Sequence, residues 1–231
     1  MDPRNLFADE RYAAFCVFCG AKPTTREHVA SRVFLDEPFP DDLPVVFSCH
    51  ECNNGFSRDE EYLACLIDCV VSGSTDPASV QREKVRRSLQ HSPALAARIA
   101  VGRSEDGSGT VIWKPQEDCV RSVIVKLARG HAAHQYSEPR LEEPEHVMIV
   151  PLMRMSAEQR GAFENLPESP GWPEIGSRAF VNMFVVGNDG YDAEGGWTVL
   201  QKGRYRYAVS QPGETVVRIV LSEYLACEVV W

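Results

Sequence analysis

Two Cys-x-x-Cys pairs lie in the first quarter of the chain. Cys16 and Cys19 form the first pair, and Cys49 and Cys52 form the second. Each short turn can present both sulfurs on one side, and two such turns complete a tetrahedral set of four thiolates, which binds structural zinc. Gly20 directly follows the first pair and permits the positive φ that such a turn often needs. We therefore expect residues 1–75 to fold around one structural Zn²⁺.

The interpretation of the cysteines as metal ligands requires that the protein is located in a reducing compartment. No apolar run reaches the roughly 18–20 residues of a membrane span, and the N-terminal residues have neither a basic segment nor an apolar one typical of a signal peptide. We expect a cytoplasmic protein without a membrane partner, where such pairs bind metal rather than form disulfides. His50, inside the second pair, is a lesser candidate ligand. The other cysteines lie in apolar periodic segments and are expected in the core: Cys65, Cys69, Cys119 and Cys227.

Hydrophobic periodicity divides the chain into three regions and predicts an α+β fold. Residues 1–75 form the zinc-bearing head and end in a helix over 57–71. Residues 76–138 are expected to be helical. Residues 139–231 form a β-rich region of unknown role, with one helix over 156–166. Its strand-like runs, which predict a mostly antiparallel sheet, cover 146–152, 178–187, 196–201, 205–210, 215–221 and 224–231.

A second group of polar residues accompanies the cysteines. Glu27 and His28 stand between the two pairs, and Asn53 follows the last cysteine directly. A histidine can deprotonate water, while carboxylate and amide oxygens bind a hard divalent cation that stabilises charge on a phosphate. These are the groups that one-metal hydrolysis of a phosphodiester requires.

The order C-x-x-C-G, E-H-V, C-x-x-C-N resembles the cysteine-rich branch of the HNH endonuclease family, over roughly residues 14–62. The resemblance implies a small ββα-metal head and a metal-dependent endonuclease that hydrolyses nucleic acid, with DNA as the expected partner. It implies that His28 is the general base, and that Glu27 and Asn53 bind a catalytic Mg²⁺ or Mn²⁺. Asn54 takes the role of Asn53 if the register shifts by one.

Two features depart from the family pattern. Pro44 stands where many members carry an asparagine that orients the base, so the orientation of His28 must come from another group. Basic residues commonly follow the last cysteine in the family, whereas this chain continues with NNGFSRDEE. Contacts with phosphate are therefore expected from Arg26, Arg32 or Arg58.

Charge argues against a broad electrostatic grip on nucleic acid. The net charge is −9, and residues 1–76 hold 6 Lys and Arg against 14 Asp and Glu. Since phosphate binding requires positive side chains, we expect weak affinity for duplex DNA. The basic stretch at 82–87 is interpreted as a solvated helix face, with a DNA contact as the alternative.

A function of another class remains open. The chain can instead be a catalytically silent zinc-knuckle scaffold whose C-terminal region binds a protein, a ligand or a second copy of the chain. His131 and His134, three residues apart on a predicted helix, leave a second metal site as a minor alternative.

Overall fold

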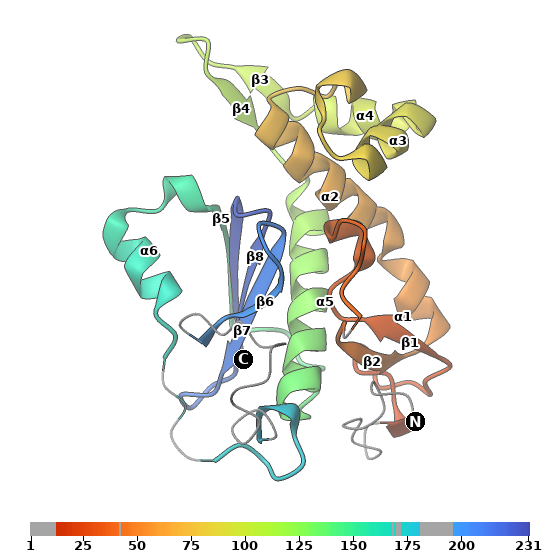
Figure 1. Ribbon diagram of the computed structural model, residues 1–231, viewed down its shortest axis with the longest axis vertical. Helices are drawn as coiled ribbons and strands as arrows, with labels where there is room; N and C mark the ends of the chain where they lie inside the picture. Colours follow the sequence, from red (N-terminus) through yellow and green to blue (C-terminus); the bar gives the residue numbers. More distant parts are fainter. Residues whose placement is uncertain (1–12, 42, 168, 170–171, 181–195) are drawn as a thin grey trace. The chain divides into compact units, whose positions relative to one another are not determined.

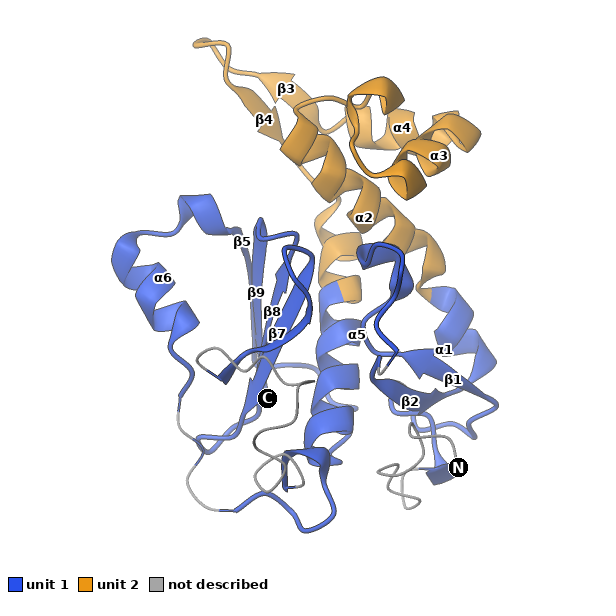
Figure 2. Cartoon of the chain, in the orientation of Figure 1, with its two compact units in different colours: residues 1–55, 124–231 blue, residues 56–123 orange. Residues whose placement is uncertain are grey.

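The computed structural model describes residues 13–41, 43–167, 169, 172–180 and 196–231. Within this part the predicted combination of helices and antiparallel strands is confirmed (Figure 1). The chain forms two compact units (Figure 2): residues 1–55 with 124–231, and residues 56–123. The predicted regions 1–75, 76–138 and 139–231 divide the chain at other places. No helix of the described residues is long and apolar enough to cross a membrane.

The first unit contains a short hairpin followed by a helix. Strands β1 (Thr25–His28) and β2 (Val45–Ser48) pair antiparallel, with the 3₁₀ helix η3 (Arg32–Phe34) between them. Helix α1 (His50–Gly55) follows β2 at once. The element order is therefore β, β, α, with one cysteine pair before the hairpin and the other at its end.

A five-stranded antiparallel sheet, counted over the described residues, forms the centre of the same unit. Its spatial order is β5-β9-β8-β7-β6. The elements are β5 (His146–Pro151), η5 (Leu152–Arg154), α6 (Ala157–Glu164), β6 (Thr198–Gln201), β7 (Tyr205–Ser210), β8 (Val216–Leu221) and β9 (Leu225–Val230). The sequence expectation for 178–187 falls almost entirely outside the described residues. All six residues of β8 are buried, as expected for a central strand covered on both faces.

Helix α5 (Glu117–Tyr136) covers one face of this sheet with its residues from Ile124 onward (Figure 1). His131 stacks on the Tyr207 ring with 3.7 Å between centroids and lies 2.7 Å from the Tyr205 hydroxyl. Tyr136 donates a hydrogen bond to the Val209 carbonyl. Helix α6 lies on the opposite face. This sandwich of helix, sheet and helix buries alternate residues of β8 on each side.

The loop after β1 is tied to the far edge of the sheet. The backbone amide of Asp36 donates to Gln201 Oε1 at 2.8 Å, and Gln201 Nε2 donates to the Asp36 carbonyl at 2.9 Å. Arg204 also forms an ion pair with the Asp36 carboxylate at 2.6 Å. Segments about 165 residues apart are thereby held together within one unit.

The second unit is mainly helical. It contains α2 (Ser57–Ser72), η4 (Pro77–Ser79), α3 (Glu83–His91), α4 (Pro93–Ala100), β3 (Arg103–Glu105), β4 (Val111–Trp113) and the first residues of α5. The predicted helix over 57–71 agrees with α2, which ends at Gly73 in the left-handed conformation (φ 71°). Its Tyr62 hydroxyl accepts the Gln116 backbone amide at 3.0 Å, and Arg98 lies over the same ring.

The basic stretch at 82–87 is partly used within this unit. Arg82 is only 6% exposed and forms an ion pair with Asp68 at 3.0 Å. The guanidinium of Arg86 donates to the Val80 carbonyl. Two of the four cations in this stretch therefore stabilise the fold, and Arg87 forms an exposed ion pair with Glu83 on the same helix.

Candidate metal centre and active site

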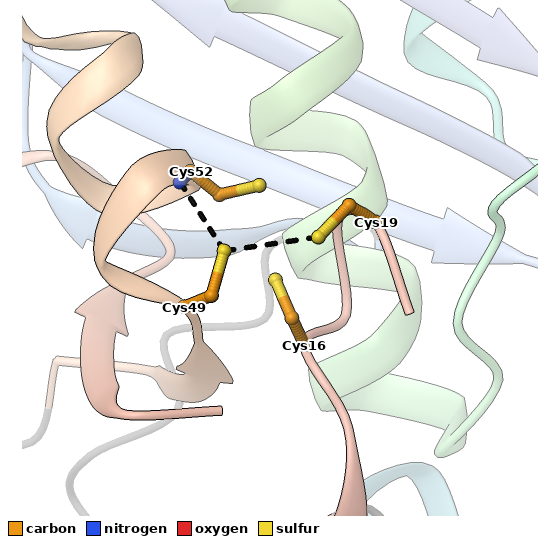
Figure 3. Close-up of side chains that lie close together, drawn as sticks. All are labelled: Cys16, Cys19, Cys49 and Cys52. Atoms are coloured by element: carbon orange, nitrogen blue, oxygen red, sulfur yellow. Dashed lines mark hydrogen bonds between the residues drawn. The ribbon is translucent and has the colours of Figure 1, made fainter. Parts of the chain in front are cut away.

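The four cysteines of the two pairs meet in space. Their sulfur atoms all lie within 4.8 Å of one another, and Figure 3 shows the four side chains pointing toward a common centre. The Sγ atoms of Cys19 and Cys49 are 3.7 Å apart. Four sulfurs at 2.3 Å from a tetrahedral zinc lie about 3.8 Å from one another, so the cluster has nearly the size of a ZnS₄ site. These four cysteines could hold a metal ion such as zinc.

Local backbone contacts shape both turns. Gly20 adopts φ 76°, and its amide donates to the Cys16 carbonyl at 2.8 Å, which closes the first turn. In the second, the Cys52 amide donates to Cys49 Sγ at 3.4 Å, and the Asn53 amide donates to the Cys49 carbonyl at 3.0 Å. The second cysteine pair thus lies at the start of helix α1, and the backbone of this first turn holds the two cysteines close together.

The thiols of this cluster ionise unequally. Burial raises the pKa of Cys16, but hydrogen bonds from the backbone at Cys49, Phe18 and Cys19 outweigh it and lower the pKa to about 7. Burial and the neighbouring sulfurs of Cys19 and Cys49 raise the pKa of Cys52. Four thiolates this close repel one another, and a divalent cation among them removes that repulsion. The donor set therefore fits a soft divalent metal.

Glu27 lies in an ion pair that the sequence analysis missed. Its Oε1 accepts a hydrogen bond from Lys126 Nζ at 2.7 Å, and the two residues are only 7% and 2% exposed. The Lys126 ammonium also lies 5.6 Å from the centre of the Phe18 ring, which belongs to the first cysteine turn. The sequence does contain a signal for this ion pair: Lys126 stands inside the apolar run VIVKLA, and a buried ammonium requires a carboxylate partner.

His28 and Asn53 both adjoin strand β1. His28 is half-buried and is the last residue of the strand, next to Glu27, so its side chain leaves the opposite face in a regular strand. The Asn53 side-chain amide donates to Thr25 Oγ1 at 3.2 Å, which ties α1 to the start of β1. Asn54 instead lies near the exposed His50 ring, with 2.9 Å between Nδ2 and Nε2. The two asparagine side chains therefore have different partners: Asn53 contacts strand β1, and Asn54 contacts His50.

Backbone pairing continues past the predicted base. The Val29 amide donates to the Pro44 carbonyl at 2.9 Å, which extends the hairpin by one hydrogen bond. Pro44 can accept this bond although it has no amide to donate. The residue that departs from the family pattern thus keeps the strand register beside His28.

The three candidate phosphate contacts are all exposed to solvent. Arg26 extends over the Phe47 ring and Arg32 over the Phe39 ring, with distances of 5.4 and 5.3 Å. Arg26 and His28 are two residues apart on β1 and so share one side of the strand. Arg58 belongs to α2 in the second unit.

His131 and His134 differ from a typical metal pair. His131 is completely buried, and burial lowers its pKa well below the ordinary value. Burial, with a smaller contribution from Arg178, lowers the pKa of His134 to about 4. Among the described residues, the four cysteines are the one group of three or more His, Cys, Asp or Glu side chains close enough to share a metal. The contacts of His131 with Tyr205 and Tyr207 give it a role in the packing of α5 on the sheet.

Comparison of the chain with protein families, with curated proteins and with solved structures finds no match.

Proposed function

We propose that the chain is a zinc-containing endonuclease of the HNH type that hydrolyses DNA phosphodiester bonds, with His28 as the general base. The order β1, β2, α1 around the four sulfurs supports this proposal, since it brings a histidine and an asparagine to one hairpin. The observation that carries it is the hydrogen bond between Asn53 and Thr25, because it links helix α1, which contains Cys52, to the strand that bears His28.

Each residue has a defined task in this proposal. The four thiolates hold a structural Zn²⁺ and fix α1 against the hairpin. His28 removes a proton from the attacking water, and Arg26 or Arg32 binds a phosphate oxygen. A Mg²⁺ or Mn²⁺ ion held by Glu27 and Asn53 would neutralise negative charge on the phosphate and the leaving oxygen. This role requires Glu27 to share its carboxylate between that ion and Lys126.

The ion pair of Glu27 with Lys126 favours a second candidate. Because an ammonium already neutralises this carboxylate, the head can be a zinc-stabilised binding module that performs no chemistry. Such a protein would keep zinc and its fold but would not cut nucleic acid.

Nicking of supercoiled plasmid distinguishes the two candidates. We expect the wild type to nick in Mg²⁺ or Mn²⁺ and not without added divalent cation, and His28→Ala to lose about 10²- to 10⁴-fold in rate with its zinc content unchanged. His50→Ala is the matched control, because His50 is exposed in the same head and lies outside the group of four cysteines that could hold the metal; it should nick like the wild type. Equal nicking by His28→Ala and the wild type would overturn the nuclease proposal. No nicking by the wild type would support the binding module.

A further inference from the structure

A pocket of about 520 Å³ opens on the face of the five-stranded sheet that carries α6. This volume falls in the range of about 300–1,000 Å³ that small-molecule sites occupy. All its lining residues belong to the first unit and lie outside the proposed nuclease site: Met148, Ile149, Val150, Pro151, Arg154, Met155, Gln159, Ala162, Phe163, Arg218 and Glu228.

Strand register aligns three residues of the pocket in one row. Met148 on β5 pairs with Glu228 on β9, and Glu228 pairs with Arg218 on β8. Directly opposed residues of an antiparallel sheet project from the same face, so all three side chains project toward α6. The row places one apolar and two charged side chains on the sheet side of the pocket.

Arg218 is a buried cation with donors held in fixed positions. It is 9% exposed, and its Nε donates to Glu228 Oε2 at 2.6 Å. Its Nη1 donates to the carbonyls of Ala162, Phe163 and Asn165 at the end of α6. Within the described part of the chain, these contacts leave its Nη2 without a hydrogen-bond acceptor. A guanidinium held on two sides and open on the third is prepared to bind a further acceptor.

The charges of the pocket do not cancel. Glu228 neutralises Arg218, but Arg154, which also lines the pocket, is exposed and forms no ion pair with any described residue. The pocket therefore carries one positive charge in excess. Its remaining walls are largely apolar, with Met148, Met155 and Phe163 as the largest side chains.

We propose that this pocket binds a small organic anion with an apolar body. The methionines and Phe163 would surround the apolar body, Arg154 would pair with the anionic group, and Arg218 Nη2 would donate to an oxygen of the ligand. Methionine and phenylalanine walls accept varied apolar shapes, while the two guanidinium groups select for charge. This site is independent of the proposed cleavage of DNA.

Two fluorescent probes that differ in charge test the proposal on the full, zinc-loaded chain. 8-Anilinonaphthalene-1-sulfonate has an aromatic body with an anion, and N-phenyl-1-naphthylamine has the same body without the sulfonate. We expect the anionic probe to bind saturably at one site per chain. Arg154→Glu should weaken its binding by about tenfold or more and weaken the neutral probe by less than about twofold, because only the anionic probe pairs with Arg154.

Two further variants complete the test. Ala162→Trp places a large ring at an exposed position of α6 that lines the pocket, and it should abolish binding of both probes without a change in circular dichroism. Arg160→Glu makes the same change of charge on α6 outside the pocket and should leave both probes within about twofold. The proposal is overturned if the anionic probe does not saturate at one site, if Arg154→Glu leaves its affinity unchanged, or if Ala162→Trp still binds either probe.

Discussion

The carboxylate of Glu27 and the ammonium of Lys126 lie 2.7 Å apart and form an ion pair that is almost completely shielded from water. The pair joins strand β1 of the cysteine-rich hairpin to helix α5, a separation of 99 residues. It neutralises a carboxylate that would otherwise carry a large desolvation cost. The hairpin and the part of α5 from Ile124 onward are therefore held together by this contact.

Removal of one partner of this ion pair should destabilise the first unit strongly. We expect Lys126→Met to lower the free energy of unfolding by about 3–5 kcal/mol, because Glu27 is left charged and buried. The double variant Glu27→Gln, Lys126→Met should recover most of that loss. Denaturant unfolding of the two single variants and the double variant measures the coupling energy. Arg160→Gln, which breaks an exposed pair at 4.0 Å, should cost less than about 1 kcal/mol. Additive losses in the double variant would show that the two side chains do not interact.

The purified chain should contain one zinc ion. Cys49→Ala should lose this metal and unfold the hairpin region, since structural zinc contributes on the order of 10 kcal/mol to small modules. Cys65→Ala is the matched control, because Cys65 is buried in α2 and lies outside the sulfur cluster. It should retain zinc. Elemental analysis together with circular dichroism checks both outcomes, and a folded wild type without metal would contradict the assignment of the site.

Acid should destabilise the protein partly through His134, whose pKa is lowered to about 4 mainly by burial. The unfolded chain takes up this proton at about pH 6.5, so the contribution to stability is complete above that pH and is lost as the pH falls toward 4. Between pH 7.5 and 5, the wild type should lose about 1–2 kcal/mol more stability than His134→Gln. Denaturant titrations at the two pH values measure this difference. Equal losses would show that His134 keeps its ordinary pKa in the folded chain.

Positive charges in the two units should contribute differently to DNA binding. Reversal of two charges on α3, by Lys84→Glu with Arg87→Glu, should leave affinity and salt dependence unchanged if these side chains form a solvated face. Arg26→Glu with Arg32→Glu should weaken binding, and the slope of log affinity against log salt should fall by about 0.9 for each lost phosphate contact. Fluorescence anisotropy with a labelled duplex at several salt concentrations measures both quantities. The reverse result would place the DNA contact on α3.

Arg82 should instead affect stability. Arg82→Gln leaves Asp68 buried without its cation, and we expect a loss of about 3–5 kcal/mol in the second unit. Hydrogen exchange of the amides of α2 reports the stability of this unit directly. Protection equal to that of the wild type would show that the ion pair contributes little.

Local patterns predicted the features that depend on local chemistry. The spacing of the cysteines predicted the sulfur cluster, and helical periodicity predicted α2 to within one residue of its observed end. The strand-like runs of the C-terminal region predicted strands β7, β8 and β9. The predicted helical region from residue 76 begins with only a short 3₁₀ helix, in which the Asp76 side chain accepts the Ala78 amide, and α3 begins at Glu83.

Long-range partners could not be predicted from one sequence. The contact of Glu27 with Lys126 depends on how α5 packs on the hairpin, and no local periodicity encodes that packing. Arg82 belonged to a basic stretch that reads as a solvated face, yet it is buried because Asp68, fourteen residues earlier, lies opposite it. The convergence of Glu27, His28 and Asn53 on one cation stays a prediction.

The contacts of Asp36 with Gln201 and Arg204 can form only late in translation, because both partners lie near the C-terminal end of this sequence. The cysteine turns are synthesised early, but the strand that fastens their following loop is made about 165 residues later. Contacts this distant in sequence slow folding, because the intervening chain must be ordered first. A nascent head could bind zinc long before its loop is anchored. An excised fragment of residues 1–55 would therefore lack both Lys126 and this anchor, and the hairpin should be studied as part of the whole chain.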